Sequence, residues 1–198
     1  MLLSELARPT RHELIGRDVE VKELIYNSRK VKNGDVFCCI VGTFADGHKY
    51  AQQAVDAGAA AAERVGELDI DVPQILVEDT RIAMAEMAAA YYGYPSREMQ
   101  MIGVTGTNGK TSTTYMLKAI AERMGKKVGL IGTIRNMIGD IIIDTERTTP
   151  ESVDLQRILR QMKDEKVDVV IMEVSSHSLD QKRVHGIEYD VGDQELVF

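Results

Sequence analysis

The chain has 198 residues and a formal net charge of −7, and 44% of its residues are hydrophobic. This length suits one large domain or two modest ones with packed cores. The negative charge argues against a general nucleic-acid-binding surface, and no apolar run approaches the ~18 residues of a membrane span. The first residues, MLLSELARPT, lack the basic segment and the apolar stretch of a secretion signal, so we expect a soluble, cytoplasmic protein.

The first half of the chain predicts a small mixed α/β domain. Residues 36–41, VFCCIV, form a short apolar strand. Its adjacent Cys38 and Cys39 are expected to be core thiols, because no second Cys/His cluster could complete a metal site with them. The other elements expected here are a helix opened by Asp46-Gly47 and ended by Gly58, a strand over residues 74–77 and a helix over residues 80–92, with residues 59–62 open between strand and helix.

A domain boundary is predicted near YPSRE, residues 94–98, so we expect one domain over residues 1–97 and a second over residues 98–198. The second half has a βαβ rhythm, and its last apolar run suits a parallel strand covered on both faces. Its expected elements are strands over 99–104, 128–131 and 167–174, a helix over 111–124, a hairpin over 135–144, and a helix with Thr149 as its N-cap, Pro150 at its first position and Leu155, Ile158, Leu159 and Met162 on its buried face.

The stretch GVTGTNGKTS, residues 103–112, lies between a predicted strand and a predicted helix, which is the context of a phosphate-binding loop. Its glycines allow backbone N–H groups to converge on phosphate oxygens, and the positive end of the helix adds to the attraction. Lys110 can reach the outer phosphates, and Thr111 can offer its hydroxyl to Mg²⁺. The loop is a variant, since Val104 stands where the common loop has its first glycine and Gly106 follows two residues later.

Glu173 is the candidate carboxylate for that Mg²⁺. It lies near the end of the apolar run VDVVIMEV, residues 167–174, and the carboxyl ends of parallel strands meet at one edge of a sheet. The polar residues 175–177 that follow suggest a hydrolase, but no G-x-S-x-G elbow occurs, so we expect them to line a polar pocket. Arg183 is either a bidentate partner for an anionic substrate group or an ordinary surface charge.

Four strings together resemble the Mur ligases of bacterial cell-wall synthesis: GVTGTNGKTS, TTPES, MEVSSHSL followed by QKRV, and NSRKVKNGDVFCCIVGTFADGHKY. The resemblance covers about residues 20–191. It is greatest for the members that add the third amino acid of the peptide stem to UDP-N-acetylmuramoyl-L-alanyl-D-glutamate. It implies an α/β chain with a small N-terminal mixed α/β domain for the UDP-linked substrate, followed by a P-loop-type parallel-sheet ATPase domain. Compared with the family, we expect the ATPase domain to be incomplete here and the C-terminal amino-acid-binding domain to be absent.

The resemblance also implies site residues. The ATP loop comprises Gly106, Thr107, Asn108, Gly109, Lys110, Thr111 and Ser112. The UDP-N-acetylmuramoyl-dipeptide would contact Ser28, Thr43, Phe44, Ala45, Thr148, Thr149, Ser175, Gln181 and Arg183. Lys110 and Glu173 would serve catalysis, with Thr111 and Glu173 on Mg²⁺. Two positions depart from the family pattern: Asn27 replaces an aspartate, and Arg147 replaces an asparagine that often precedes the threonine pair.

The implied reaction is ATP-dependent amide formation. The γ-phosphate of ATP passes to the substrate carboxylate, and the amine of a diamino acid attacks the resulting acyl phosphate and releases phosphate. Because two anions are held together, Mg²⁺, Lys110 and the helix terminus must neutralise their charge. The sequence leaves open whether the diamino acid is meso-diaminopimelate or L-lysine, and it does not give the oligomeric state.

The chain by itself is not expected to ligate. The family's second metal-binding histidine, its carbamylated lysine and its third domain are not found, and the ending DQELVF departs from the family pattern. Three alternatives stay open: another Mur ligase, such as the next enzyme of the pathway, a P-loop phosphotransferase or GTPase switch, and a non-catalytic nucleotide-sugar-binding module. The switch is disfavoured because no Asn-Lys-x-Asp-type guanine-reading element occurs.

Overall fold

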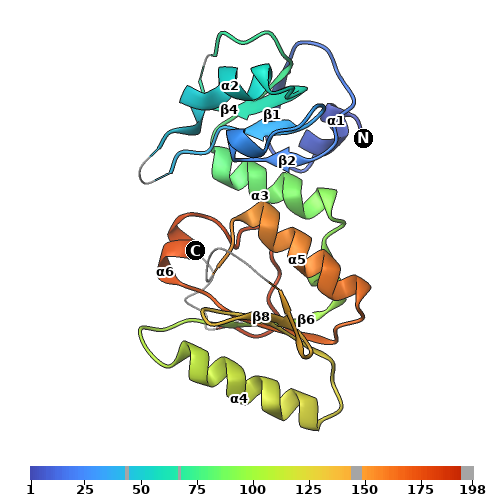
Figure 1. Cartoon of the computed structure of the whole chain (residues 1–198), viewed down its shortest axis with the longest axis vertical. Helices are drawn as coiled ribbons and strands as arrows, with labels where there is room; N and C mark the ends of the chain where they lie inside the picture. Colours follow the sequence, from blue (N-terminus) through green and yellow to red (C-terminus); the bar gives the residue numbers. More distant parts are fainter. Residues whose placement is uncertain (43–44, 67, 144–148, 193–198) are drawn as a thin grey trace. The chain divides into compact units, whose positions relative to one another are not determined.

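The computed structural model describes residues 1–42, 45–66, 68–143 and 149–192. The chain divides into two compact units, Met1–Tyr91 and Tyr92–Phe198, and each is built on a five-stranded sheet with helices (Figure 1). The expected α/β class is therefore confirmed. Within the described ranges, no helix has the length and apolar character needed to cross a membrane.

The sheet of the first unit has the order β1-β5-β4-β3-β2, with β2 to β5 parallel and β1 antiparallel to β5. The elements of this unit are α1 (Leu3–Ala7), β1 (His12–Ile15), β2 (Leu24–Ile25), the 3-10 helix η1 (Ser28–Lys30), β3 (Val36–Cys38), the 3-10 helix η2 (Gly47–Tyr50), α2 (Ala51–Asp56), β4 (Ala61–Arg64), β5 (Gln74–Val77) and α3 (Thr80–Tyr91). Parallel strands of this kind are covered on both faces, which explains the apolar residues of β3 and of β5 after Gln74.

Local chemistry sets the ends of these elements. The predicted strand over residues 36–41 is wrong in length, because β3 ends at Cys38. The backbone then turns so that Gly47 approaches residue 40, where an added Cβ would lie 2.8 Å from the Ile40 backbone. Asp46 opens the next helical segment by accepting a hydrogen bond from the His48 N–H, as expected of an N-cap. Gly58, at a φ of +104°, follows α2. The ambiguous residues 59–62 lead into strand β4.

The sheet of the second unit has the order β6-β10-β7-β8-β9, in which β6, β10 and β7 are parallel and β8 and β9 form the expected hairpin. The elements of this unit are the 3-10 helix η3 (Pro95–Glu98), β6 (Gln100–Val104), α4 (Lys110–Arg123), β7 (Val128–Ile131), β8 (Asn136–Ile138), β9 (Ile141–Ile143), α5 (Ser152–Asp164), β10 (Val169–Glu173) and α6 (Ser176–Asp180). Figure 1 shows α4 and α5 on opposite faces of this sheet.

Strand β10 lies between β6 and β7 and is buried along its whole length. On one face, Val170 and Met172 pack with the buried side of α5, where Leu155, Ile158, Leu159 and Met162 lie as expected. On the other face, Val169 and Ile171 pack toward α4. The parallel strand covered on both faces is thus confirmed, and its carboxyl end is fixed by packing on both sides.

The predicted cap of α5 is wrong. The helix begins at Ser152, with Glu151 in an extended N-cap conformation and no side-chain cap. The hydroxyl of Thr149 instead donates to the Glu173 carbonyl at 3.3 Å. The Glu151 carboxylate pairs with Arg183, so it is not available to the helix N–H groups. The start of α5 is therefore tied to the end of β10 and to residue 183.

The core of the first unit holds the free thiols of Cys38 and Cys39, as expected. Glu63 of β4 is also completely buried. Burial and the charge of Asp79 raise the pKa of the Glu63 carboxyl well above its usual range, and the nearby Cys38 thiol offsets only part of this. Neither carboxyl oxygen has a hydrogen-bond partner of ordinary geometry. Glu63 is therefore a core group that folding favours in its protonated form.

We expect Glu63→Gln to flatten the dependence of stability on pH. Because the pKa of Glu63 is raised in the folded state, this carboxyl stabilises the fold fully at a pH below its unfolded-state pKa of 4.5. The stabilisation is lost as the pH rises through the folded-state pKa. The wild type should lose stability relative to the variant by up to about 1.4 kcal/mol per pH unit above that lower limit. Urea unfolding at several pH values measures this, and hydrogen exchange of the β4 amides assigns it to the first unit.

The matched control is Glu13→Gln, which removes an exposed carboxyl from β1 of the same sheet. This control should keep the pH profile of the wild type. Parallel profiles for the wild type and Glu63→Gln would contradict the assignment.

Candidate active site

The glycine-rich loop connects β6 to α4, as its sequence predicts. Gly106 has a φ of +139° and Gly109 a φ of +82°, and Gly109 is the N-cap of α4. A Cβ added at Gly109 would meet no atom within 4 Å, so the positive φ and not a lack of space explains the glycine. Residues 106–109 are exposed, and Lys110 Nζ donates to the Gly106 carbonyl at 2.7 Å. The loop therefore presents an exposed backbone with the Lys110 ammonium group beside it.

Glu173 ends β10 directly beside this loop, since its Cα pairs with Val104 of β6. The residue is only 1% exposed. Its Oε2 accepts a hydrogen bond from Thr111 Oγ1 at 3.1 Å, so the carboxylate already touches the first turn of α4. A hydroxyl has one proton and two lone pairs, so Thr111 can donate to Glu173 and still offer oxygen to a cation.

Thr133 supplies the other two hydrogen bonds to Glu173. Its backbone N–H donates to Oε1 at 3.1 Å and its hydroxyl donates to Oε2 at 2.9 Å. The neighbouring Gly132 has no room for a side chain, because a Cβ there would lie 2.6 Å from Oε1. Sequence reasoning missed both residues. Their position in the sequence could have indicated them, because they directly follow β7, a third parallel strand whose carboxyl end lies at the same edge of the sheet as those of β6 and β10.

The donor set fits a hard divalent cation. All three hydrogen-bond donors to the Glu173 carboxylate are neutral groups, and a buried charge is costly unless it is paired. In the part of the chain that the structure describes, no cluster of three or more His, Cys, Asp or Glu could hold a metal. A cation at Thr111 and Glu173 would therefore take its remaining ligands from phosphate and water, as Mg²⁺ does on nucleotides.

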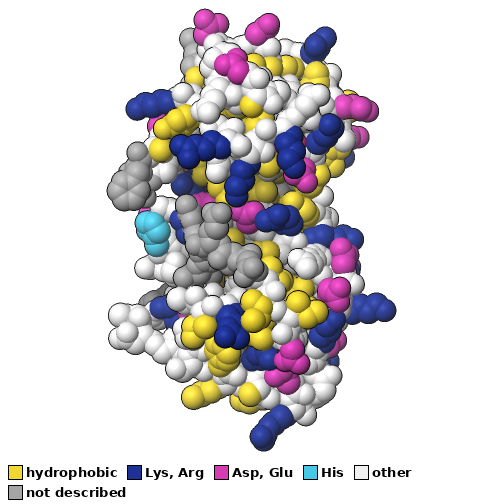
Figure 2. All heavy atoms as spheres, in the orientation of Figure 1, with side chains coloured by type: hydrophobic (Ala, Val, Ile, Leu, Met, Phe, Trp, Pro, Cys, Tyr) yellow, Lys and Arg dark blue, Asp and Glu magenta, His cyan; other side chains and the backbone are white. Residues whose placement is uncertain are grey.

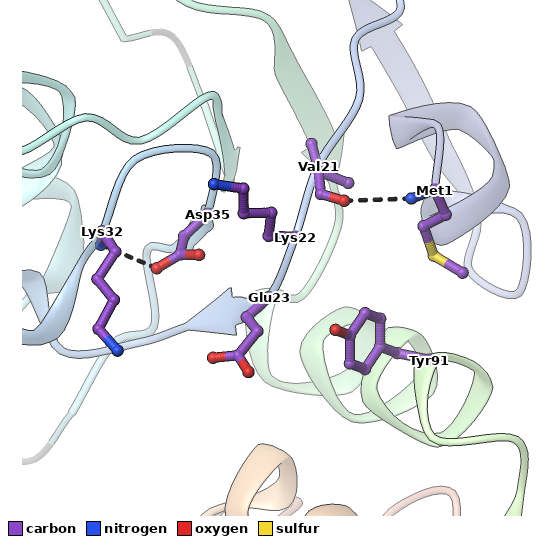
Figure 3. Close-up of a pocket in the computed structure, with 7 residues that line it drawn as sticks. All are labelled: Met1, Val21, Lys22, Glu23, Lys32, Asp35 and Tyr91. Atoms are coloured by element: carbon purple, nitrogen blue, oxygen red, sulfur yellow. Dashed lines mark hydrogen bonds between the residues drawn. The ribbon is translucent and has the colours of Figure 1, made fainter.

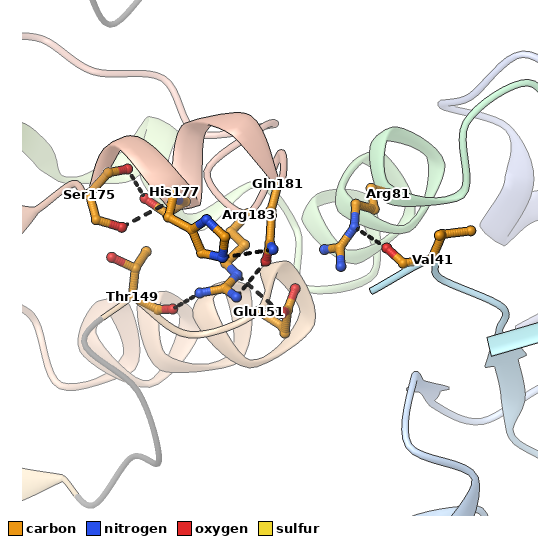
Figure 4. Close-up of polar contacts among 9 residues, drawn as sticks. Val41, Arg81, Thr149, Glu151, Ser175, His177, Gln181 and Arg183 are labelled. Atoms are coloured by element: carbon orange, nitrogen blue, oxygen red, sulfur yellow. Dashed lines mark hydrogen bonds and ion pairs between the residues drawn. The ribbon is translucent and has the colours of Figure 1, made fainter. Parts of the chain in front are cut away.

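A second polar cluster surrounds Arg183 (Figure 4). Its guanidinium donates from Nη1 to the Thr149 carbonyl at 3.2 Å and from Nη2 to Gln181 Oε1 at 2.5 Å. Its Nε lies 3.1 Å from Oε1 of Glu151, and the two side chains are only 10% and 4% exposed. Arg183 is therefore not an ordinary surface charge. Sequence reasoning missed Glu151, although the quoted TTPES string contains it.

Ser175 and Gln181 lie at opposite ends of α6. The Ser175 side chain caps this helix by accepting from the Ser178 N–H at 3.1 Å. The Gln181 amide reaches back to the His177 ring, with 2.8 Å between the two nitrogens. The structure thus brings Thr149, Gln181 and Arg183 into one hydrogen-bonded cluster and leaves Ser175 on the neighbouring turn (Figure 4). Thr148 and Arg147 lie outside the described residues.

In the first unit, Ser28 begins η1 and its hydroxyl donates to Gln53 Oε1 of α2 at 3.3 Å. Asn27, which departs from the family pattern, caps η1 through its side-chain oxygen. Ala45 is exposed, and its carbonyl accepts from the Gly42 N–H at 2.8 Å. Thr43 and Phe44 lie outside the described residues.

Two hollows open on the first unit. One, of about 460 Å³, lies at the carboxyl ends of β3, β4 and β5 and is lined by Val41, Asp46, His48, Val65, Glu78, Asp79, Thr80 and Arg81. The other, of about 540 Å³, lies at the opposite ends of β2 and β3 (Figure 3) and is lined by Met1, Val21, Lys22, Glu23, Lys32, Asp35 and Tyr91. Ligands of parallel sheets bind at the carboxyl ends of the strands, so the first hollow is the better candidate, and its lining includes Val41 and Asp46, which flank the predicted substrate segment in the sequence.

The surface carries no sign of a polyanion-binding face in the view of Figure 2. Lys and Arg side chains alternate there with Asp and Glu side chains on both units. This agrees with the net charge of −7.

Comparison with protein families gives two matches that together span most of the chain. The description "Mur ligase family, catalytic domain" matches residues 20–92, and "Mur ligase middle domain" matches residues 104–192. The second match covers the glycine-rich loop, Thr133, Glu173 and Arg183.

Individual relatives agree with these matches. The UDP-N-acetylmuramoyl-L-alanyl-D-glutamate–2,6-diaminopimelate ligase of Clostridium botulinum is 52% identical over 177 residues, which cover 86% of this chain and 36% of that protein. The ligase of the same name from Bacillus velezensis is 46% identical over 186 residues, which cover 94% of this chain and 38% of that protein. A solved structure of a ligase of this name has a TM-score of 0.73 at 26% identity, covering 85% of this chain and 35% of that chain.

The chain thus spans little more than a third of the length of these relatives. The two matches fall one in each half of the chain, and the second includes Gly106 to Ser112 and Glu173. On these grounds the chain belongs to the Mur ligase family.

Proposed function

We propose that this chain carries the UDP-substrate domain and the phosphate-loop region of an ATP-dependent ligase. The ligase adds diaminopimelate to UDP-N-acetylmuramoyl-L-alanyl-D-glutamate in peptidoglycan synthesis. The observation that carries this proposal is the contact of Glu173 with Thr111 at the glycine-rich loop, because the described hydrogen-bond donors to this buried carboxylate are all neutral. Diaminopimelate is preferred over lysine because the relatives at 46–52% identity are named for it.

The glycine-rich loop binds the triphosphate in this proposal. Backbone N–H groups around Gly106 and Gly109, together with the N-terminus of α4, face the phosphates, and the 14-residue length of α4 gives it a full helix dipole. Lys110 leaves the Gly106 carbonyl to meet the outer phosphates as a point charge. These groups reduce the repulsion between ATP and an approaching carboxylate.

Thr111 and Glu173 hold Mg²⁺ in the proposal. The ion, when bound, neutralises phosphate charge and polarises the phosphoryl group. The protein's own part is to fix the two oxygen ligands, one at the start of α4 and one at the end of β10. Because α4 and β10 pack together in the core of the unit, the distance between these ligands is set before the nucleotide arrives.

The Arg183 cluster positions the muramoyl-peptide in this proposal. Three of its five N–H groups are directed at Thr149, Glu151 and Gln181, which holds the guanidinium plane in place. In the proposal this fixed guanidinium faces a carboxylate of the substrate. The hollow lined by Val41, Asp46 and His48 is the proposed place of the uridine nucleotide. Because ATP and nucleotide-linked precursors are cytoplasmic metabolites, we propose that the reaction takes place in the cytoplasm.

Lys110→Ala should weaken the binding of MgATP to the chain. Loss of a charge-assisted contact to phosphate costs about 1.5–3 kcal/mol, or roughly 10- to 100-fold in Kd. Isothermal titration calorimetry with ATP and Mg²⁺ measures this. Lys126→Ala, which removes an exposed lysine after the far end of α4, is the matched control and should bind as the wild type does. Equal affinity of Lys110→Ala and the wild type would remove the assigned role, and tighter binding of GTP than of ATP would favour a switch protein.

The chain alone should bind UDP-N-acetylmuramoyl-L-alanyl-D-glutamate without forming product. It spans about 36% of the related ligases, so the parts of those enzymes that match no residue here are not supplied. An assay of ATP-dependent amide formation with diaminopimelate checks this, with a complete relative as the positive control. Turnover at a rate comparable to that of the complete enzyme would contradict this prediction, because the unmatched parts of the related ligases would then not be needed for catalysis.

A further inference from the structure

We propose that Thr133 is the positioning residue of the metal-binding carboxylate, a role that it performs through Glu173 rather than by touching the nucleotide. This inference rests on the proposed function, because it concerns the Mg²⁺ site assigned to Thr111 and Glu173. It adds a third element, the loop between β7 and β8, to a site that the sequence assigned to the glycine-rich loop and β10 alone.

The first argument is the geometry of the two hydrogen bonds. A glutamate carboxyl group turns almost freely about its last torsion, so burial alone does not fix the plane of its oxygens. Thr133 engages both oxygens at once, with its N–H on Oε1 at 3.1 Å and its hydroxyl on Oε2 at 2.9 Å. Two donors from one residue set the plane of the carboxylate in a way that the single contact from Thr111 cannot.

The second argument is that the loop is built to hold Thr133 in this place. The Gly132 N–H donates to Asn136 Oδ1 at 3.0 Å, and Asn136 is buried at the start of β8. Gly132 itself has no space for a side chain beside Oε1 of Glu173. The loop is thus held by the Gly132–Asn136 hydrogen bond at one side and by its close approach to the Glu173 carboxylate at the other. Thr133 is exposed, so a contact in the core does not account for the position of its hydroxyl.

The third argument concerns charge. Thr133 offers only neutral donors, so the carboxylate keeps its full negative charge for a cation. Two carboxylate oxygens have about four acceptor positions, and the hydrogen bonds from Thr111 and Thr133 take three of them. One position is left for a metal ion. A lysine or arginine in place of Thr133 would orient the same carboxylate but would compete with the metal.

The test compares nucleotide binding with and without Mg²⁺ in the 198-residue chain. The Kd for ATP is measured by calorimetry in excess Mg²⁺ and in EDTA. The Kd in EDTA divided by the Kd in Mg²⁺ is the ratio that reports how much the metal strengthens binding. Partners that orient metal ligands are typically worth 10- to 100-fold in metal affinity. Thr133→Val should lower the ratio about tenfold or more. It should leave the Kd in EDTA unchanged, because the phosphates do not touch Thr133.

Two further variants separate the hydroxyl from the fold. Thr133→Ser keeps the hydroxyl and should keep the ratio of the wild type. Thr113→Val makes the same chemical change at an exposed position of α4 and should change neither Kd. Thermal unfolding of each variant shows that the fold is intact, and Thr133→Val is expected to melt close to the wild type because the residue is exposed.

The outcomes are distinct. A wild-type ratio that Thr133→Val retains would overturn the positioning role and leave the proposed function standing. Equal losses in Thr133→Ser and Thr133→Val would also overturn it, because the hydroxyl would not be the cause. A wild-type chain that binds ATP in neither condition would overturn the proposed function and this inference together.

Discussion

The second unit depends on one constraint, the burial of the Glu173 carboxylate at the end of a strand that is packed on both faces. An ionised carboxyl is costly in such a place unless other groups compensate it. The three surrounding donors reduce the cost without cancelling the charge. The strand cannot move the carboxylate out to water, because Val169 to Met172 are fixed by α4 on one side and by α5 on the other.

The topology explains how distant parts of the sequence reach this carboxylate. Strands β6, β10 and β7 are parallel neighbours, so their carboxyl ends lie at one edge of the sheet. The glycine-rich loop follows β6, Glu173 ends β10 and Thr133 follows β7. Between the first and the last of these residues in sequence lie about 60 residues that build the scaffold. This is the general reason why the edge of a parallel sheet collects functional groups from separate segments.

Much of this arrangement could be predicted from the sequence, because the signals were local. The loop string, the apolar run before Glu173 and the alternation of strand and helix indicated the second unit and its nucleotide edge. What escaped prediction depended on contacts between segments. Thr149 was expected to cap α5, but its hydroxyl meets the carbonyl of Glu173 instead. Thr133 and Glu151 belong to no sequence motif that predicts their contacts. Only the folded structure shows that Thr133 contacts Glu173 and that Glu151 pairs with Arg183.

Three glutamates are buried among the residues that the structure describes, and they show how the same group takes different roles. Burial raises the pKa of Glu63, so this carboxyl is neutralised by a proton and belongs to the core. Glu151 is neutralised by Arg183 at 3.1 Å and serves to fix a cation. In the described structure the Glu173 carboxylate accepts hydrogen bonds from the neutral groups of Thr111 and Thr133 and forms no ion pair. Of the three, it is the carboxylate whose charge remains to be balanced from outside, which is the physical condition for a site that gains its cation together with a nucleotide.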